Sequence, residues 1–163
     1  MVINLIILFL SFFQINQEKH LGSIERISSD INKLIDLDSK IEILAEGFDW
    51  SEGPVWSKKL NSILFSDVPN NVIYKWNEKE GLSVFSKPIG YSGKIPNLKK
   101  AGTNGLTIDS EGNLIICMHG DRMIAKMENL NTEKLSSIIR SYNNKILNSP
   151  NDLVYDSYGN LFF

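Results

Sequence analysis

The segment Asn104-Gly-Leu-Thr-Ile-Asp-Ser-Glu-Gly-Asn-Leu-Ile-Ile116 returns later in the chain as Asn151-Asp-Leu-Val-Tyr-Asp-Ser-Tyr-Gly-Asn-Leu-Phe-Phe163. A more distant copy runs from Glu52 to Phe65. Each copy contains a polar residue, a short apolar run, a turn and a second apolar run. The last two copies begin 47 residues apart, and Val55 lies 51 residues before its counterpart Leu106. A repeat of about 40–50 residues with about four short strands is typical of a β-propeller blade.

The chain after residue 40 has the pattern of short antiparallel strands. Apolar or alternating runs are separated by Gly, Asn, Asp, Ser or Pro, which favour tight turns. Runs of this kind occupy residues 41–47, 63–65, 72–76, 82–85, 114–117 and 123–127. No convincing long helical pattern occurs after residue 40, so the sequence predicts an all-β fold.

The segment before residue 40 has helical spacing instead. Isoleucine and leucine recur at steps of three and four residues between Ile24 and Ile35. Ser28 or Ser29 can cap a short helix that ends near Asp36. We therefore predict a signal peptide at residues 1–17, an N-terminal extension with a short helix at 18–40, and a partial propeller domain at 41–163.

The number of repeats is small for a propeller. A propeller usually closes with about four to eight blades, and six blades of this size need roughly 300 residues. The 163 residues hold about two and a half blades, and Phe163 lies inside an expected strand. We therefore expect this chain to be the amino-terminal fragment of a longer protein.

The first residues suggest export. Val2 to Phe13 are apolar except for Asn4 and Ser11. A bilayer span needs about 20 such residues, so this run has instead the length of a secretory signal. No Lys or Arg precedes it and no small-residue cleavage site follows, so a buried strand or an uncleaved anchor remains an alternative. The prediction is an exported protein, periplasmic or extracellular, without a stable membrane span.

Composition excludes several classes of function. The formal net charge is −2 and the pI is about 5.7, which gives no basic face for nucleic acid. One cysteine, Cys117, excludes an intramolecular disulfide framework and a multi-cysteine zinc site. Two histidines exclude an all-histidine metal site. Any bound metal is therefore expected to have mostly oxygen ligands. Composition makes no prediction of the oligomeric state.

Five motifs occur in the order and spacing of one protein family; they are Trp50–Trp56, Leu64–Pro69, Asn104–Thr107, His119–Arg122 and Leu147–Asp152. In these motifs the chain resembles the gluconolactonase, senescence-marker-protein and luciferin-regenerating-enzyme-like family, in its bacterial gluconolactonase-like branch. The resemblance implies a six-bladed propeller with one divalent cation in the central channel. That cation is commonly Ca²⁺, with Mg²⁺, Mn²⁺ and Zn²⁺ as alternatives. It also implies hydrolysis of sugar lactones.

The resemblance assigns roles to individual residues. Glu52 matches the first metal-binding carboxylate, and Asn151 matches the channel asparagine that binds the metal or contacts the substrate. Asn104 occupies the same position of the intervening repeat and is expected to line the channel as a substrate-binding residue. The alternatives are a solvated loop carboxylate for Glu52 and an Asx-turn residue for Asn151. Two further family ligands, an asparagine and an aspartate, have no counterpart in this chain.

Two other residues have less definite roles. His119 follows the second inner apolar run, where it could contact substrate or take part in catalysis, or else pair with Asp121 or a backbone carbonyl. Cys117 lies in an apolar run and is expected to be a small core residue rather than a nucleophile.

The leading hypothesis is a metal-dependent lactone hydrolase with a small-molecule lactone or ester substrate. In this hypothesis the metal polarises the substrate carbonyl, and the 163-residue chain lacks later ligands and is inactive alone. The alternative is a propeller that only binds a ligand, or an inactive truncated remnant.

Overall fold

The computed structural model describes residues 20–94 and 102–163. The chain forms two compact units, residues 1–46 and 47–163. The predicted signal peptide at residues 1–17 lies outside the described residues. Within the described ranges, no helix is long and apolar enough to cross a membrane.

The first unit contains the predicted short helix. It is the 3₁₀ helix η1, Ser29–Lys33, and the Ser28 side chain caps it by accepting a hydrogen bond from the Asp30 amide at 3.2 Å. None of its residues is buried. The strand expected over residues 41–47 was wrong, because only Glu42 pairs there, in an isolated bridge with His20. A lone bridge has no ladder to extend it, so alternation alone did not produce a strand.

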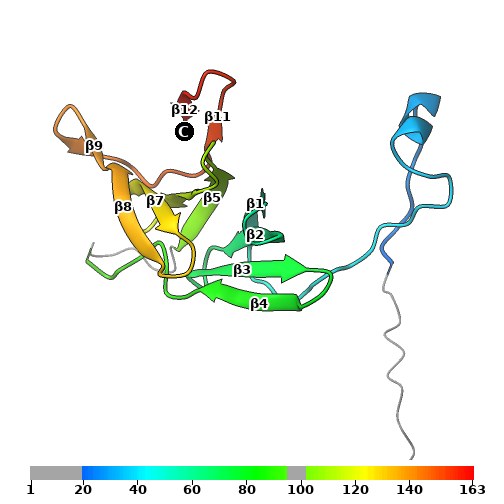
Figure 1. Cartoon of the computed structure of the whole chain (residues 1–163), viewed down its shortest axis with the longest axis horizontal. Coiled ribbons are helices and arrows are strands. Elements are labelled where there is room, and N and C mark those ends of the chain that lie inside the picture. Colours follow the sequence, from blue (N-terminus) through cyan, green and yellow to red (C-terminus); the bar gives the residue numbers. More distant parts are fainter. Residues whose placement is uncertain (1–19, 95–101) are drawn as a thin grey trace, which may run out of the picture. The chain divides into compact units, whose positions relative to one another are not determined.

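The second unit contains two successive four-stranded antiparallel sheets in simple meander order (Figure 1). The first sheet is β1 (Ser51–Ser57), β2 (Ser62–Asp67), β3 (Val72–Asn77) and β4 (Gly81–Ser86). The second sheet is β5 (Thr103–Ile108), β6 (Leu114–Met118), β7 (Met123–Asn129) and β8 (Lys134–Ile139). Two hairpins follow, β9 (Ser141–Tyr142) with β10 (Lys145–Ile146) and β11 (Val154–Tyr155) with β12 (Leu161–Phe162). Two complete propeller blades and the opening of a third are therefore present, as the repeats predicted.

Strand β6 of the second sheet is buried on both faces. Leu114, Ile116 and Met118 of β6 belong to the large core cluster that includes Leu64 and Ile73 of the first sheet. The intervening Ile115 and Cys117 belong to a second cluster, with Leu153 and residues of the β11–β12 hairpin. A strand covered on both sides reads as a continuous apolar run, which explains the uninterrupted sequence of β6.

The first sheet differs, because one of its faces is partly open. Trp50 and Trp56 are 58% and 52% exposed. Phe65 and Tyr74 pack instead against Phe48, with ring centroids 4.9 and 5.1 Å from the Phe48 ring. Among the described residues no other sheet packs against this face.

The first strands of successive repeats are in backbone contact. A Cβ atom at Gly53 of β1 would lie 2.7 Å from the Leu106 amide nitrogen and 2.8 Å from the Gly105 Cα. A Cβ atom at Gly105 of β5 would lie 2.7 Å from the Asp152 Cα. Distances below 3.0 Å are not tolerated by real Cβ atoms, so each contact requires glycine.

The repeated Asp-Ser-x-Gly-Asn turn has the same hydrogen bonds in both copies. Asp109 Oδ1 accepts from the amides of Glu111 and Asn113 at 2.9 and 2.8 Å. Asp156 Oδ1 accepts from the amides of Tyr158 and Asn160 at 2.9 and 2.8 Å. An aspartate that holds the turn in this way fixes the register of the two flanking strands.

Substitution of Gly53 tests the contact between β1 and β5. Gly53→Ala is expected to lower the free energy of unfolding by about 1–3 kcal/mol more than Gly81→Ala. Both glycines have positive φ, +57° and +69°, so they share the strain of a left-handed alanine, but the Gly81 Cβ position is open. Urea unfolding measures the difference, and equal losses in both variants would contradict the contact.

The Asp109 turn makes stability depend on pH. Burial alone would raise the pKa of Asp109, but hydrogen bonds from Asn113 and from Lys126 outweigh it and lower the pKa below its ordinary 3.8. The ionised carboxylate therefore stabilises the fold above about pH 4, and this stabilisation is lost as pH falls through the lowered pKa. We expect Asp109→Asn to destabilise the protein at pH 7 and much less near pH 2. A difference in unfolding free energy that stays constant with pH would contradict this.

Candidate active site

The three matched polar residues lie at the start of successive repeats, although the ladder register aligns Glu52 with Thr103, one residue before Asn104. Glu52 lies in β1 opposite Ser66, Asn104 is the second residue of β5, and Asn151 lies shortly before β11. The pairing of β1 with β2 shifts between Glu52 and Val55, and that of β5 with β6 shifts between Thr103 and Leu106. Such irregularities re-aim side chains at the rims of β structures.

The structure joins Asn104 to Asn151. Asn104 Nδ2 donates to Asn151 Oδ1 at 2.7 Å, and the Gly105 amide donates to the Asn151 carbonyl at 2.7 Å. Asn104 is 3% exposed, whereas Asn151 is exposed. The buried Asn104 side chain therefore fixes the orientation of the exposed Asn151 side chain. Both side chains lie at the start of their repeats.

Backbone contacts also bring the segment that contains Glu52 next to Asn104. The Gly53 Cβ position lies 2.9 Å from the Asn104 carbonyl oxygen. Ser66, which faces Glu52 across the ladder, donates its hydroxyl to the Asn104 carbonyl at 2.7 Å. The half-buried Glu52 side chain accepts from Trp50 Nε1 at 2.7 Å through Oε1. Its other oxygen, Oε2, has no hydrogen bond within the described residues.

Asp67 is a residue to which sequence reasoning gave no role. Its carboxylate is fully buried and accepts from the Trp50 amide at 3.1 Å, the Asp49 amide at 3.3 Å and Asn70 Nδ2 at 2.8 Å. These bonds hold the backbone that leads into Glu52, so Asp67 is a positioning residue. The signal was an acidic residue inside the strand motif Leu64–Pro69, where it follows Ser66.

His119 lies just beyond the end of β6, whose last residue Met118 pairs with Thr103. Its Nδ1 atom is buried and has no hydrogen-bond partner in the described residues. The predicted alternative, a pair with Asp121, is not formed, because Asp121 Oδ1 accepts from the amide and hydroxyl of Ser92, both at 2.9 Å. The structure does not join His119 to the Glu52, Asn104 and Asn151 group by any hydrogen bond.

Cys117 is confirmed as a core residue. Its side chain is fully buried, and burial together with the nearby Asp152 carboxylate raises the pKa of the thiol to about 12. A thiol with this pKa stays protonated at neutral pH and is a poor nucleophile.

The donor atoms of the site fit a hard cation. The described residues contain no group of three or more His, Cys, Asp or Glu side chains placed to hold a metal. Glu52, Asn104 and Asn151 offer instead carboxylate and amide oxygens, which Ca²⁺ and Mg²⁺ prefer. An amide oxygen has two lone pairs, so Asn151 Oδ1 can accept from Asn104 and still face a cation. These residues supply part of a donor set for a cation that takes six or more oxygens.

The fold is that of a partial β-propeller, with polar residues at the start of each repeat. The sequence pattern of the SMP-30/Gluconolactonase/LRE-like region matches residues 50–163. The chain belongs to this family.

Relatives support the assignment. The chain is 36% identical over 145 residues to a gluconolactonase of Zymomonas mobilis, covering 88% of this chain and 40% of that protein. A gluconolactonase structure from Xanthomonas campestris matches with a TM-score of 0.64 and 27% identity, over 77% of this chain and 38% of the other. A Northeast Structural Genomics Consortium structure matches with a TM-score of 0.62 and 33% identity, over 72% and 37%. The chain thus spans about 40% of the length of these relatives.

The Asn104–Asn151 bond predicts an energetic coupling. Asn151→Ala leaves the buried Asn104 amide without its partner, which should lower the free energy of unfolding by about 1–3 kcal/mol. Asn131→Ala, at an exposed asparagine without side-chain hydrogen bonds in the described residues, should stay within about 0.5 kcal/mol. A double-mutant cycle with Asn104→Ala, followed by urea unfolding, measures the coupling. Strict additivity of the two substitutions would contradict it.

Proposed function

We propose that the protein, in its complete form, hydrolyses sugar-type lactones with the help of one divalent cation. The observation that carries the proposal is the placement of Glu52, Asn104 and Asn151 at the start of successive repeats, whose backbones are in contact. Membership of the family and the likeness to the Zymomonas gluconolactonase give this placement a chemical context. The substrate is a small molecule, a lactone or a related ester.

The residues present have distinct tasks in this proposal. Among these three residues, Glu52 contributes the negative charge, while Asn104 and Asn151 contribute neutral oxygens. A hard cation bound there supplies Lewis-acid polarisation of the lactone carbonyl. With two amides and one carboxylate, these three donors leave a positive field for the developing oxyanion. Asn104, held by Asn151, can orient a substrate hydroxyl or carbonyl through its amide.

We propose Ca²⁺ as the cation, because the ligands are oxygens and the group needs several more of them. Mg²⁺ and Mn²⁺ share the preference for oxygen, and Zn²⁺ is a further alternative. We also propose an exported protein, on the basis of the apolar segment Val2–Phe13. The buried Cys117 is compatible with an oxidising compartment, since it offers no accessible thiol.

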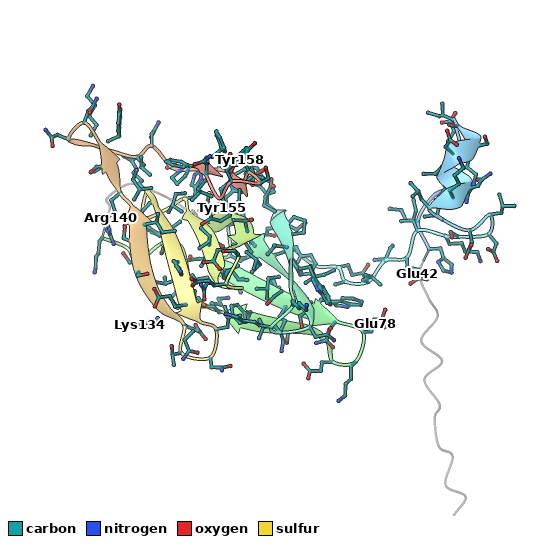
Figure 2. The ribbon with its side chains drawn as sticks, turned by 45° about the horizontal axis from the view of Figure 1, so that its top comes forward. Glu42, Glu78, Lys134, Arg140, Tyr155 and Tyr158 are labelled. Atoms are coloured by element: carbon teal, nitrogen blue, oxygen red, sulfur yellow. The ribbon has the colours of Figure 1, made fainter. Side chains whose placement is uncertain are left out.

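Replacement of the carboxylate tests the proposal. Glu52→Gln removes the negative charge and should weaken Ca²⁺ binding by about tenfold or more, because ligand charge tunes calcium affinity. Glu78→Gln, at an exposed position in the β3–β4 turn (Figure 2), should leave the affinity unchanged. Isothermal titration calorimetry measures both affinities on the protein purified from its native source.

The same protein preparations distinguish a lactone hydrolase from a propeller that only binds a ligand. Opening of glucono-δ-lactone, followed by acid release, should depend on added Ca²⁺, stop with a chelator and fall strongly in Glu52→Gln. If the calcium-loaded protein opens no lactone or ester, the hydrolase proposal is wrong, and a ligand-binding propeller is the better description. If Glu52→Gln binds Ca²⁺ as tightly as the unchanged protein, Glu52 is not a ligand.

A further inference from the structure

A cavity of about 430 Å³ lies between the loop after β4 and strand β8. Its apolar wall includes Ile89, Met118, Met123 and Leu135. Three of these residues are 4–5% exposed, so they present apolar atoms to the cavity from a well-packed core. An apolar cavity with a few polar groups at one side is the usual form of a small-molecule site.

The cavity has a cationic side chain at one end. Leu135 lies near the start of β8, and Arg140 follows its last residue Ile139. Met123 lies at the Arg140 end, because its neighbour Ile124 pairs with Ile139. Figure 2 shows Arg140 at one end of β8 and Lys134 at the other. A smaller adjoining cavity of about 120 Å³ is lined by Ser92, Lys94, Asp121 and Arg140.

The positive charge at this end is not neutralised. Within the described residues, neither Lys94 nor Arg140 forms an ion pair. Asp121 is the one carboxylate among the lining residues, and its Oδ1 already accepts two hydrogen bonds from Ser92. The two cationic side chains and the single carboxylate give this end of the cavity a net positive charge.

The wall opposite β8 is held in place by backbone and amide hydrogen bonds. Asn71 Oδ1 accepts from the Tyr91 amide at 3.2 Å, and Asn71 Nδ2 donates to the Tyr91 carbonyl at 3.0 Å. The Ile89 amide donates to the Asn71 carbonyl at 3.1 Å, and the Asp121 amide donates to the Gly90 carbonyl at 2.8 Å. A wall fixed in this way keeps the cavity formed without a ligand and lowers the entropic cost of binding.

We propose that this cavity binds a small carboxylate with an unbranched apolar chain. The carboxylate lies between Arg140 and Lys94, and the chain lies against the apolar wall of Ile89, Met118 and Met123. Arg140 offers paired N–H donors that match a carboxylate, and the methionines adapt to an unbranched chain. This site is separate from Glu52, Asn104 and Asn151, and it goes beyond the proposed lactone hydrolysis.

Octanoate is the probe for the experiment, in calcium-free buffer with chelator so that the result is independent of the proposed catalytic cation. Calorimetry should show saturable binding of one octanoate per chain. Acetate, which has the head group alone, and 1-octanol, which has the chain alone, should bind at least about tenfold more weakly, because each loses one half of the interaction. Equal binding of octanoate and 1-octanol, or no saturable binding of octanoate, overturns the proposal.

Substitutions identify the cationic end. Arg140→Gln should weaken octanoate binding by about tenfold, the effect expected for loss of a charged hydrogen bond, and should leave 1-octanol binding unchanged. Lys134→Gln removes a cation from the same strand outside the cavity and should change neither affinity. Arg140 is exposed, so its replacement should not disturb folding. If Arg140→Gln and Lys134→Gln have equal effects, general surface charge explains the binding and the proposal is wrong.

Discussion

The close backbone contact between the first strands of successive repeats determines the arrangement of the second unit. Gly53 lies against Asn104 and Gly105, and Gly105 lies against Asn151 and Asp152. A side chain at either glycine would separate the sheets, since its Cβ would come within 3.0 Å of backbone atoms. The core between the two sheets can then close at normal packing density only because these inner edges meet without side chains.

The candidate site follows from the same contact. Each of these glycine contacts brings the polar residue of one repeat close to that of the following repeat, although the residues are about fifty positions apart in sequence. The hydrogen bonds from Ser66 to the Asn104 carbonyl and from the Gly105 amide to the Asn151 carbonyl then fix the register between repeats. The group therefore takes one polar side chain from the start of each repeat, so its chemistry depends on single residues far apart in sequence rather than on a continuous motif.

The repeat made much of this predictable. Asn104 and Asn151 are equivalent in the strand registers, whereas Glu52 is offset from Asn104 by one residue. The strands around residues 63–65, 72–76, 82–85, 114–117 and 123–127 were confirmed. The local sequence pattern gave wrong predictions where tertiary contacts determine whether a strand forms. Residues 41–47 alternate but have no ladder to join, while β8 was missed because most of its side chains face solvent. The role of Asp67 and the cavity beside Arg140 depend on contacts between distant loops, which no local sequence feature encodes.

The two sheets also show how burial depends on neighbours rather than on composition. Strand β6 is covered on both faces, and all of its residues are buried. The first sheet has equally apolar side chains on its second face, yet Trp56 there is 52% exposed and Val84 is 55% exposed. In a closed ring of blades every sheet has two neighbours, and an aromatic face of this kind has the composition of an interior. The exposure of Trp56 and Val84 therefore reflects the absence of a packed sheet against this face among the described residues, and not a polar composition of the strands.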